Sequence, residues 1–244
     1  MKKELREQIK QDEFASGLER AVAWAGQHRD ELRIGVGVAV VLLAAGGAVA
    51  YFQAQRAREA DRALRDALTT YEAPVSTEVP PGADRPAGQV FASAEEKYKT
   101  AAAAFEGVER RYGSSAVGIR AKYYAALARI ELKQYAEAEK ALQEIQARGS
   151  GIEPELARVA MADLYRRSGQ VDKAVEAYKG LATNPSANLP RDFALLSAAQ
   201  TLDDAQRWAE ARATYRQLTE EFPASVYAEE ARTRAEYLQT AGQG

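Results

Sequence analysis

An uninterrupted apolar run, residues 34–52, is the feature that most constrains how this chain folds. It reads IGVGVAVVLLAAGGAVAYF and contains no charged residue. A helix over this run is about 28 Å long, close to the hydrocarbon thickness of a bilayer. Its apolar side chains point in every direction, whereas a soluble helix of this length would have a polar face. The run predicts one membrane-spanning helix. The alternative is a buried core helix, but the rest of the chain provides no elements to surround it.

The position of this run bears on its cleavage and on its orientation. Ala48, Val49 and Ala50 fit the pattern of a signal-peptide cleavage site, but 33 residues precede the run, and the run is longer than a usual signal sequence. We therefore expect an uncleaved, single-pass anchor. The excess of Lys and Arg lies on the short N-terminal side, and long following domains are translocated largely regardless of charge. This asymmetry favours a cytoplasmic N-terminus.

Small residues recur along the run. Gly35 and Ala39, like Gly46 and Ala50, are spaced four residues apart, which permits close helix packing in lipid. Such pairs are frequent by chance in spans rich in Ala and Gly. They only hint at a helix partner, which for a homo-oligomer is a second copy of this chain.

The composition excludes several classes of function. A net charge of −2 provides no basic surface for nucleic acid, and the absence of cysteine removes disulfides, thiolate metal sites and cysteine nucleophiles. His28 is the single histidine, so the usual nucleophile-base pairs and transition-metal clusters are missing. Asp203 and Asp204 are adjacent and point apart on a helix, which indicates a surface cap. We expect no enzyme activity, no metal and no cofactor.

The tail before the anchor, residues 1–33, is predicted to be cytoplasmic. From Phe14 its apolar residues, such as Leu18 and Val22, recur at helical spacing. This amphipathic helix either rests on the membrane or a partner, or has no role beyond capping the span.

A juxtamembrane segment, residues 53–93, follows the anchor. It is predicted to continue as a helix to Tyr71. Residues 73–93 then contain four prolines, which favour an exposed, extended and mobile loop.

From residue 94 onward the chain has an internal period. Tyr135, Val171 and Trp208 are each followed three residues later by alanine, and they are separated by 36 and 37 residues. Another alanine lies twelve residues before each of these. The pairs are Ala126 and Ala138, Ala162 and Ala174, and Ala199 and Ala211. Two small residues at this spacing indicate that two helices cross in close contact.

This pattern resembles the tetratricopeptide repeat, in which helices A and B form an antiparallel pair. The second unit matches best, through Ala162, Tyr165, Gly169, Val171, Ala174, Tyr178, Leu181 and Pro185. The first unit departs from the pattern, with Arg129 at the aromatic position and Lys133 where glycine is usual. An earlier half-unit around Phe105 supplies a helix B, whose helix A is the arginine-rich segment after the anchor. Residues 225–238 supply a final capping helix. We predict an all-α fold, with residues 94–244 forming a tetratricopeptide α-solenoid.

The resemblance also implies which helix A residues face the concave side. These are Arg120, Tyr123, Leu127, Ile130 and Glu131; Leu156, Val159, Asp163, Arg166 and Arg167; and Phe193, Leu196, Gln200, Asp203 and Asp204. The candidate partner-binding residues among them are Tyr123, Leu127, Val159, Asp163, Arg166, Arg167, Phe193 and Leu196. An apolar strip rimmed by charges suits an amphipathic or extended segment, with the two arginines contacting acidic partners. The alternative is that the strip packs against the next helix.

The order of parts, a short tail, one span and a tetratricopeptide domain, resembles the bacterial ancillary SecYEG translocon subunit family (YfgM-like). This resemblance implies an inner-membrane protein with periplasmic repeats that contact translocon subunits, periplasmic chaperones or exported chains. The long N-terminal helix and the Pro-rich segment depart from that family. The rival hypothesis is a structural scaffold for envelope or cell-division complexes, which would self-associate.

Overall fold

The computed structural model describes residues 24, 26–78, 88–113, 115–149, 151–184 and 189–241. The chain divides into two compact units, Met1–Glu59 and Ala60–Gly244, and each is described by itself. The amphipathic helix predicted from Phe14 lies outside the described residues, except for the exposed Trp24 at its end.

The first unit contains most of helix α2 (Arg29–Glu72), which includes the whole apolar run. Among the described residues, α2 is the helix that is long enough and apolar enough to cross a membrane. Its most apolar stretch of 18 residues has a mean hydropathy of 2.2. None of that stretch is buried, and Leu43, for example, is 76% exposed. The alternative of a buried core helix is therefore wrong. The predicted continuation beyond residue 52 is confirmed, because α2 ends only at Glu72.

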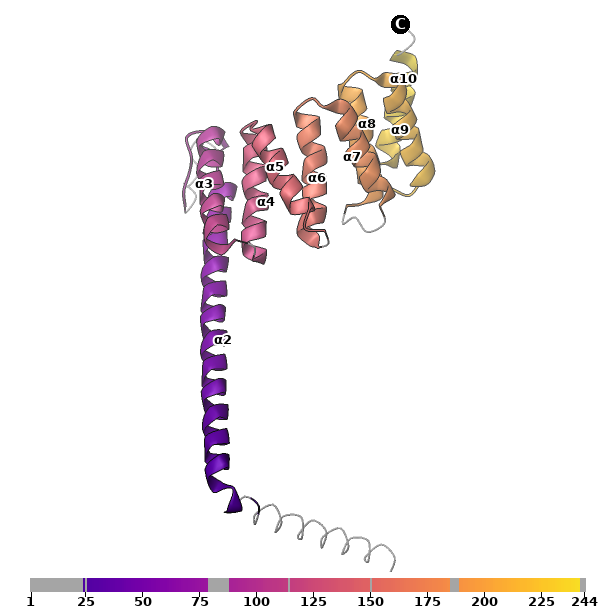
Figure 1. Ribbon diagram of the computed structural model, residues 1–244. Helices are drawn as coiled ribbons and strands as arrows, with labels where there is room; N and C mark the ends of the chain where they lie inside the picture. The colour runs from indigo at the N-terminus through magenta and orange to yellow at the C-terminus, as the bar shows by residue number, and fades with distance from the viewer. Residues whose placement is uncertain are drawn as a thin grey trace, which may run out of the picture. The chain divides into compact units, whose positions relative to one another are not determined.

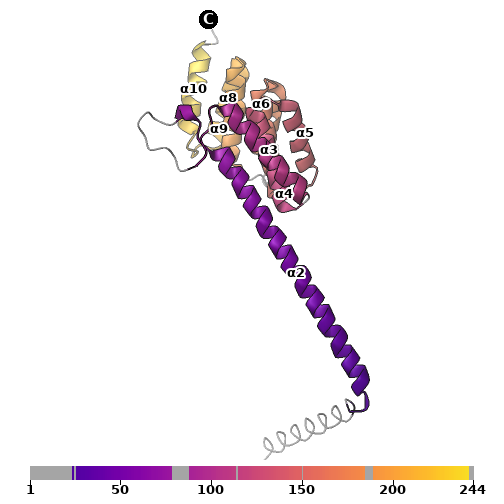
Figure 2. The same cartoon turned by 90° about the vertical axis from the view of Figure 1, so that its left-hand side faces the viewer.

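The second unit begins within α2, at Ala60. Its helices lie side by side in chain order (Figure 1), and Figure 2 views this row from its α3 end. After the short 3-10 helix η1 (Ser76–Glu78), they are α3 (Ala94–Tyr112), α4 (Ala116–Glu131), α5 (Tyr135–Gln146), α6 (Ile152–Arg167), α7 (Val171–Thr183), α8 (Arg191–Asp204), α9 (Trp208–Glu221) and α10 (Ala228–Ala241). The described residues contain no β-strand, so the all-α prediction is confirmed.

The helix pairs meet at the alanines that define the period. Ala126, Ala138, Ala162, Ala174, Ala199 and Ala211 all have no exposed surface. Each pair joins a helix A (α4, α6 or α8) to the following helix B (α5, α7 or α9). Because alanine is the smallest side chain that a helix carries without loss of stability, the two backbones approach closely at these crossings.

The turns between the paired helices share one backbone geometry. Lys133, Gly169 and Gln206 occupy the same place in their units and have φ values of 59°, 76° and 58°. The next residue closes each turn with an N–H bond to the carbonyl five residues back: Gln134 to Arg129, Gln170 to Tyr165 and Arg207 to Leu202, each at 2.9 Å. This is the Schellman arrangement, which requires a left-handed residue. Lys133, which stands where the repeat pattern usually has glycine, therefore leaves the geometry of the turn unchanged.

The predicted half-unit is present at the start of the second unit. Ala60, Leu64 and Ala67 of α2 are buried in one cluster with Ala101 and Phe105 of α3. The arginine-rich segment after the anchor thus serves as the helix A of this pair. Its arginines lie on the exposed faces, as an amphipathic helix requires.

The Pro-rich segment differs from the exposed loop that we predicted. Val75 and Phe91 are buried and form an isolated bridge, with Ser76 N–H donating to the Phe91 carbonyl at 2.8 Å and Phe91 N–H to the Pro74 carbonyl at 3.1 Å. The two ends of the segment therefore hold each other against the protein. Residues 79–87 lie outside the described residues.

Helix α10 closes the row, as predicted for the final segment. Ala231, Ala235 and Leu238 are buried against the preceding repeat, whereas Glu229, Glu230 and Arg232 on the other faces are exposed. A polar outer face of this kind is what ends a solenoid in water.

Candidate interaction surface

The eight candidate residues on α4, α6 and α8 are called the helix A strip below. Tyr123 and Leu127 lie half-buried against the core of the first full repeat, and Val159 lies half-buried against the next core. Phe193 is 37% exposed, and its ring lies 5.9 Å from that of Tyr227. These four strip residues therefore retain apolar surface after the repeat cores are formed.

Leu196 was predicted to face a partner, and the structure corrects this. Its side chain is only 4% exposed and belongs to the core shared by α7, α8, α9 and α10. Helix α8 is buried on almost every side, because Leu195, Ala198 and Leu202 are buried as well. At this position, and at the equally buried Ile130, the alternative of packing within the solenoid is correct.

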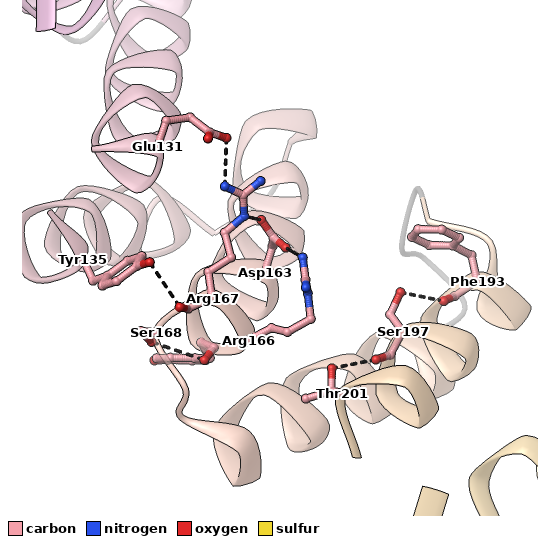
Figure 3. Close-up of polar contacts among 10 residues, drawn as sticks. Glu131, Tyr135, Asp163, Arg166, Arg167, Ser168, Phe193, Ser197 and Thr201 are labelled. Atoms are coloured by element: carbon pink, nitrogen blue, oxygen red, sulfur yellow. Dashed lines mark hydrogen bonds and ion pairs between the residues drawn. The ribbon is translucent and has the colours of Figure 1, made fainter. Parts of the chain in front are cut away.

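The two arginines of the strip are bound within the protein, as Figure 3 shows. Arg166 lies 2.6 Å from one oxygen of Asp163, and Arg167 lies 2.8 Å from the other. Arg167 also reaches Glu131 of the preceding repeat at 3.0 Å. The two positive charges are thus balanced by two carboxylates, so this part of the strip is nearly neutral rather than a basic site for acidic partners.

Hydrogen bonds to backbone hold the end of α6 beside this network. The hydroxyl of Tyr135 donates to the carbonyl of Arg167 at 3.1 Å, and that of Ser168 donates to the carbonyl of Tyr165 at 3.2 Å (Figure 3). The Tyr135 contact joins neighbouring repeats. It fixes the carbonyl end of α6, from which Arg167 extends.

The buried hydroxyls of α8 are satisfied inside their own helix. Ser197 donates to the Phe193 carbonyl at 3.0 Å, and Thr201 donates to the Ser197 carbonyl at 2.7 Å (Figure 3). They therefore leave the Phe193 end of the strip without a polar group that requires a partner.

Tyr123 provides a hydroxyl at the other end of the strip. Burial, and to a smaller extent the neighbouring Tyr124, raises the pKa of Tyr123 above its ordinary value. The phenol therefore stays protonated at neutral pH and combines apolar ring surface with a hydrogen-bond donor.

Of the acidic pair at the end of α8, Asp203 differs from the surface cap that we predicted. The Asp203 carboxylate is 9% exposed and lies 2.5 Å from Arg234 of α10, whereas Asp204 is exposed. Sequence reasoning also missed Tyr227, which lies beside Phe193. It stands just before the cap helix and outside the repeat period, so no periodic signal marked it.

Within the described ranges, no three His, Cys, Asp or Glu side chains lie close enough together to hold a metal ion. The charged groups of the strip, Asp163, Arg166 and Arg167, are ion-paired with one another or with Glu131, and none is a nucleophile beside a base. The arrangement is suited to apolar contact and to hydrogen bonding.

Comparison with known proteins agrees with the repeat geometry. Residues 193–225, which cover most of α8 and all of α9, match the tetratricopeptide repeat family. No curated protein and no solved structure matched the chain. Together with the repeated helix pairs, the match shows that the second unit is an α-helical solenoid that contains a tetratricopeptide repeat, a kind of repeat that mediates protein–protein interaction.

Proposed function

We propose that this chain is a membrane-anchored interaction protein whose helix A strip binds a segment of another polypeptide. The observation that carries the proposal is the apolar surface left by Tyr123, Leu127, Val159 and Phe193 after the repeat cores are complete. Aromatic anchors with large contact area dominate the energetics of many interfaces. The strip has such an anchor at each end, in Tyr123 and Phe193.

The charges of the strip select the kind of segment. Because Arg166 and Arg167 are already paired with Asp163 and Glu131, breaking these pairs for an acidic ligand would cost more than it gains. Apolar side chains of an extended or amphipathic segment are the fitting ligand. The ion pairs then form a polar rim rather than the main contact.

The apolar run of α2 supports a position at a membrane. We place the chain in the bacterial inner membrane as a single-pass protein, with residues 1–33 in the cytoplasm, residues 34–52 in contact with lipid and the repeats in the periplasm. The resemblance of the order of parts to the ancillary SecYEG translocon subunit family makes translocon subunits, periplasmic chaperones and exported chains the proposed partners. Tethering to the same membrane supplies an effective concentration of order mM, so weak contacts at the strip suffice.

Protease treatment of spheroplasts tests the topology. With the N-terminus inside, added protease digests the repeats and leaves a membrane-embedded fragment that begins at Met1. Protected repeats would reverse the orientation. A mature chain that begins at Tyr51 would instead show cleavage after Ala50.

Photo-crosslinking in intact membranes tests the binding surface. Crosslinkers at Tyr123, Leu127 and Phe193 should capture translocon subunits, chaperones or exported chains. The matched controls are Lys99 on α3 and Glu220 on α9, which are exposed on helix B, and these should capture fewer. Equal labelling from both sets would refute binding at the strip, whereas self-crosslinks alone would favour the scaffold.

A further inference from the structure

A second surface lies on the other side of α6. Arg158, Met161 and Tyr165 recur at intervals of three and four residues and line a groove between α5 and α7. At 3.6 residues per turn, the centre of this row lies roughly 150° around the helix axis from that of the strip residues Val159 and Asp163. A ligand in this groove therefore leaves the helix A strip free.

The groove has an apolar floor and a low wall. Met161 and Leu181 are almost fully buried and form the floor, while Ala177 and Gly180 of α7 face the groove with little or no side chain. A Cβ added at Gly180 would meet nothing within 4 Å. The groove is therefore open along α7, where a longer residue would fill it.

Arg158 supplies a positive charge to the lining of this groove. Arg166 and Arg167 of the same helix are ion-paired, whereas half-buried Arg158 has no hydrogen bond or ion pair to any described residue. A guanidinium presents several donors in a planar fork that matches a carboxylate. Its position beside the apolar floor makes the groove complementary to an acidic group next to an apolar one.

Two amide side chains of α5 extend this complementarity. Gln143 donates to Glu139 and Gln146 donates to the Ala157 carbonyl, each at 3.3 Å, so their NH₂ groups are engaged. Both residues line the groove, and the carbonyl oxygens of their side chains accept no hydrogen bond from a described residue. Such oxygens can accept from the backbone N–H groups of an extended peptide.

We infer that the groove between α5 and α7 binds a short extended segment of a partner protein in which an Asp or Glu adjoins a large apolar residue. The carboxylate pairs with Arg158, and the apolar side chain covers Met161 and Leu181. This site is separate from the helix A strip and does not depend on the function proposed for the strip.

Methionine labelling offers a direct readout, because the chain has only two methionines, Met1 and Met161. The full chain in mild detergent, with ¹³C-labelled methionine methyl groups, is titrated with two soluble peptides of equal length. One contains Asp-Leu pairs and the other Lys-Leu pairs, both separated by Gly-Ser. The Asp-Leu peptide should shift the Met161 methyl signal and leave the Met1 signal in place, while the Lys-Leu peptide should shift neither.

Matched variants distinguish binding in the groove from non-specific binding of the peptide. Arg158→Gln should weaken binding of the Asp-Leu peptide about tenfold, because a charged hydrogen-bonded contact is lost. Gly180→Leu should abolish binding by filling the groove. Gly180→Ala, which adds only a Cβ to the same helix position, should retain it, as should Arg120→Gln, which removes one positive charge from α4.

Three results would overturn the inference. They are equal shifts from both peptides, an unchanged affinity in Arg158→Gln, and undiminished binding in Gly180→Leu with native circular dichroism. If Gly180→Leu fails to fold, the Arg158→Gln comparison still decides the outcome. Loss of crosslinking at the helix A strip would leave these results untouched, so the two proposals fail separately.

Discussion

Arg234 of the cap helix α10 donates two hydrogen bonds to the carboxylate of Asp203 in α8, from Nε at 2.5 Å and from Nη2 at 3.0 Å. The Asp203 carboxylate also accepts a longer bond, 3.5 Å, from the hydroxyl of Tyr215 in α9. Three helices thus meet at one carboxylate that is only 9% exposed. This contact fastens the cap to the last repeat.

Removing the arginine should loosen the cap. In a fragment that begins at Ala60, Arg234→Ala leaves a nearly buried carboxylate with Tyr215 alone. The change should lower the free energy of unfolding in urea by about 1 to 2 kcal/mol. Partial exposure of Arg234 favours the lower end of that range. The control is Arg232→Ala, whose ion pair with Glu229 is exposed and should contribute little. Equal losses from the two variants would contradict the role of Asp203.

The starting point of a soluble fragment should matter. A fragment from Ala94 lacks Ala60, Leu64 and Ala67, and therefore exposes the side of Phe105 that these residues cover. Both fragments should be helical by circular dichroism, but the one from Ala60 should unfold at the higher urea concentration. Equal midpoints would mean that the end of α2 contributes nothing to the core, and a substantial β signal would refute the solenoid itself.

Overpacking at a helix crossing should be costly. Ala174 has no exposed surface, so Ala174→Leu forces α6 and α7 apart and should destabilise the fragment by about 1 to 3 kcal/mol. The matched control is Ala136→Leu on the exposed face of α5, which should change the midpoint little. An unchanged midpoint in Ala174→Leu would show that this crossing is not tight.

The left-handed turns predict stabilising changes. Lys133 and Gln206 adopt φ values of 59° and 58°, a region that costs a residue with a Cβ roughly 1 kcal/mol relative to glycine. Lys133→Gly and Gln206→Gly should therefore each raise stability by about that amount, and Gly169→Ala should lower it similarly. As a control, Lys140→Gly within α5 should be destabilising, because glycine weakens a helix interior. A loss of stability in Lys133→Gly would show that its side chain compensates for the strain.

Much of the fold is encoded locally and was predictable. The 36- and 37-residue spacing and the paired alanines report contacts within one repeat, where sequence separation fixes geometry. Ala126, Ala162 and Ala199 are buried as expected for this reason. The apolar character of the long uncharged run of α2 was equally predictable, because length and composition alone decide whether a helix is apolar enough to cross a membrane.

The candidate site was less predictable, because it depends on contacts between repeats. Leu196 and Phe193 stand three residues apart on α8, yet the surrounding helices bury one and expose the other. Arg167 and Glu131 are 36 positions apart in the chain, and their ion pair depends on how one repeat stacks on the next. The pairs of Arg166 and Arg167 with Asp163 lie within α6, at spacings of three and four residues that a sequence pattern can indicate, whereas the pair of Arg167 with Glu131 is visible only in the stacked structure.

The bridge between Val75 and Phe91 joins the beginning and the end of the connection from α2 to α3. Two backbone hydrogen bonds and two buried side chains fix the ends, so the length of chain beyond them is uncoupled from the pairing of α2 with α3. Extending a closed loop costs only about 0.6 kcal/mol for each doubling of its length. The connection is therefore a site to test for grafting: because its two ends are fixed, an epitope or fluorescent reporter inserted between residues 78 and 88 should leave the pairing of α2 with α3 intact.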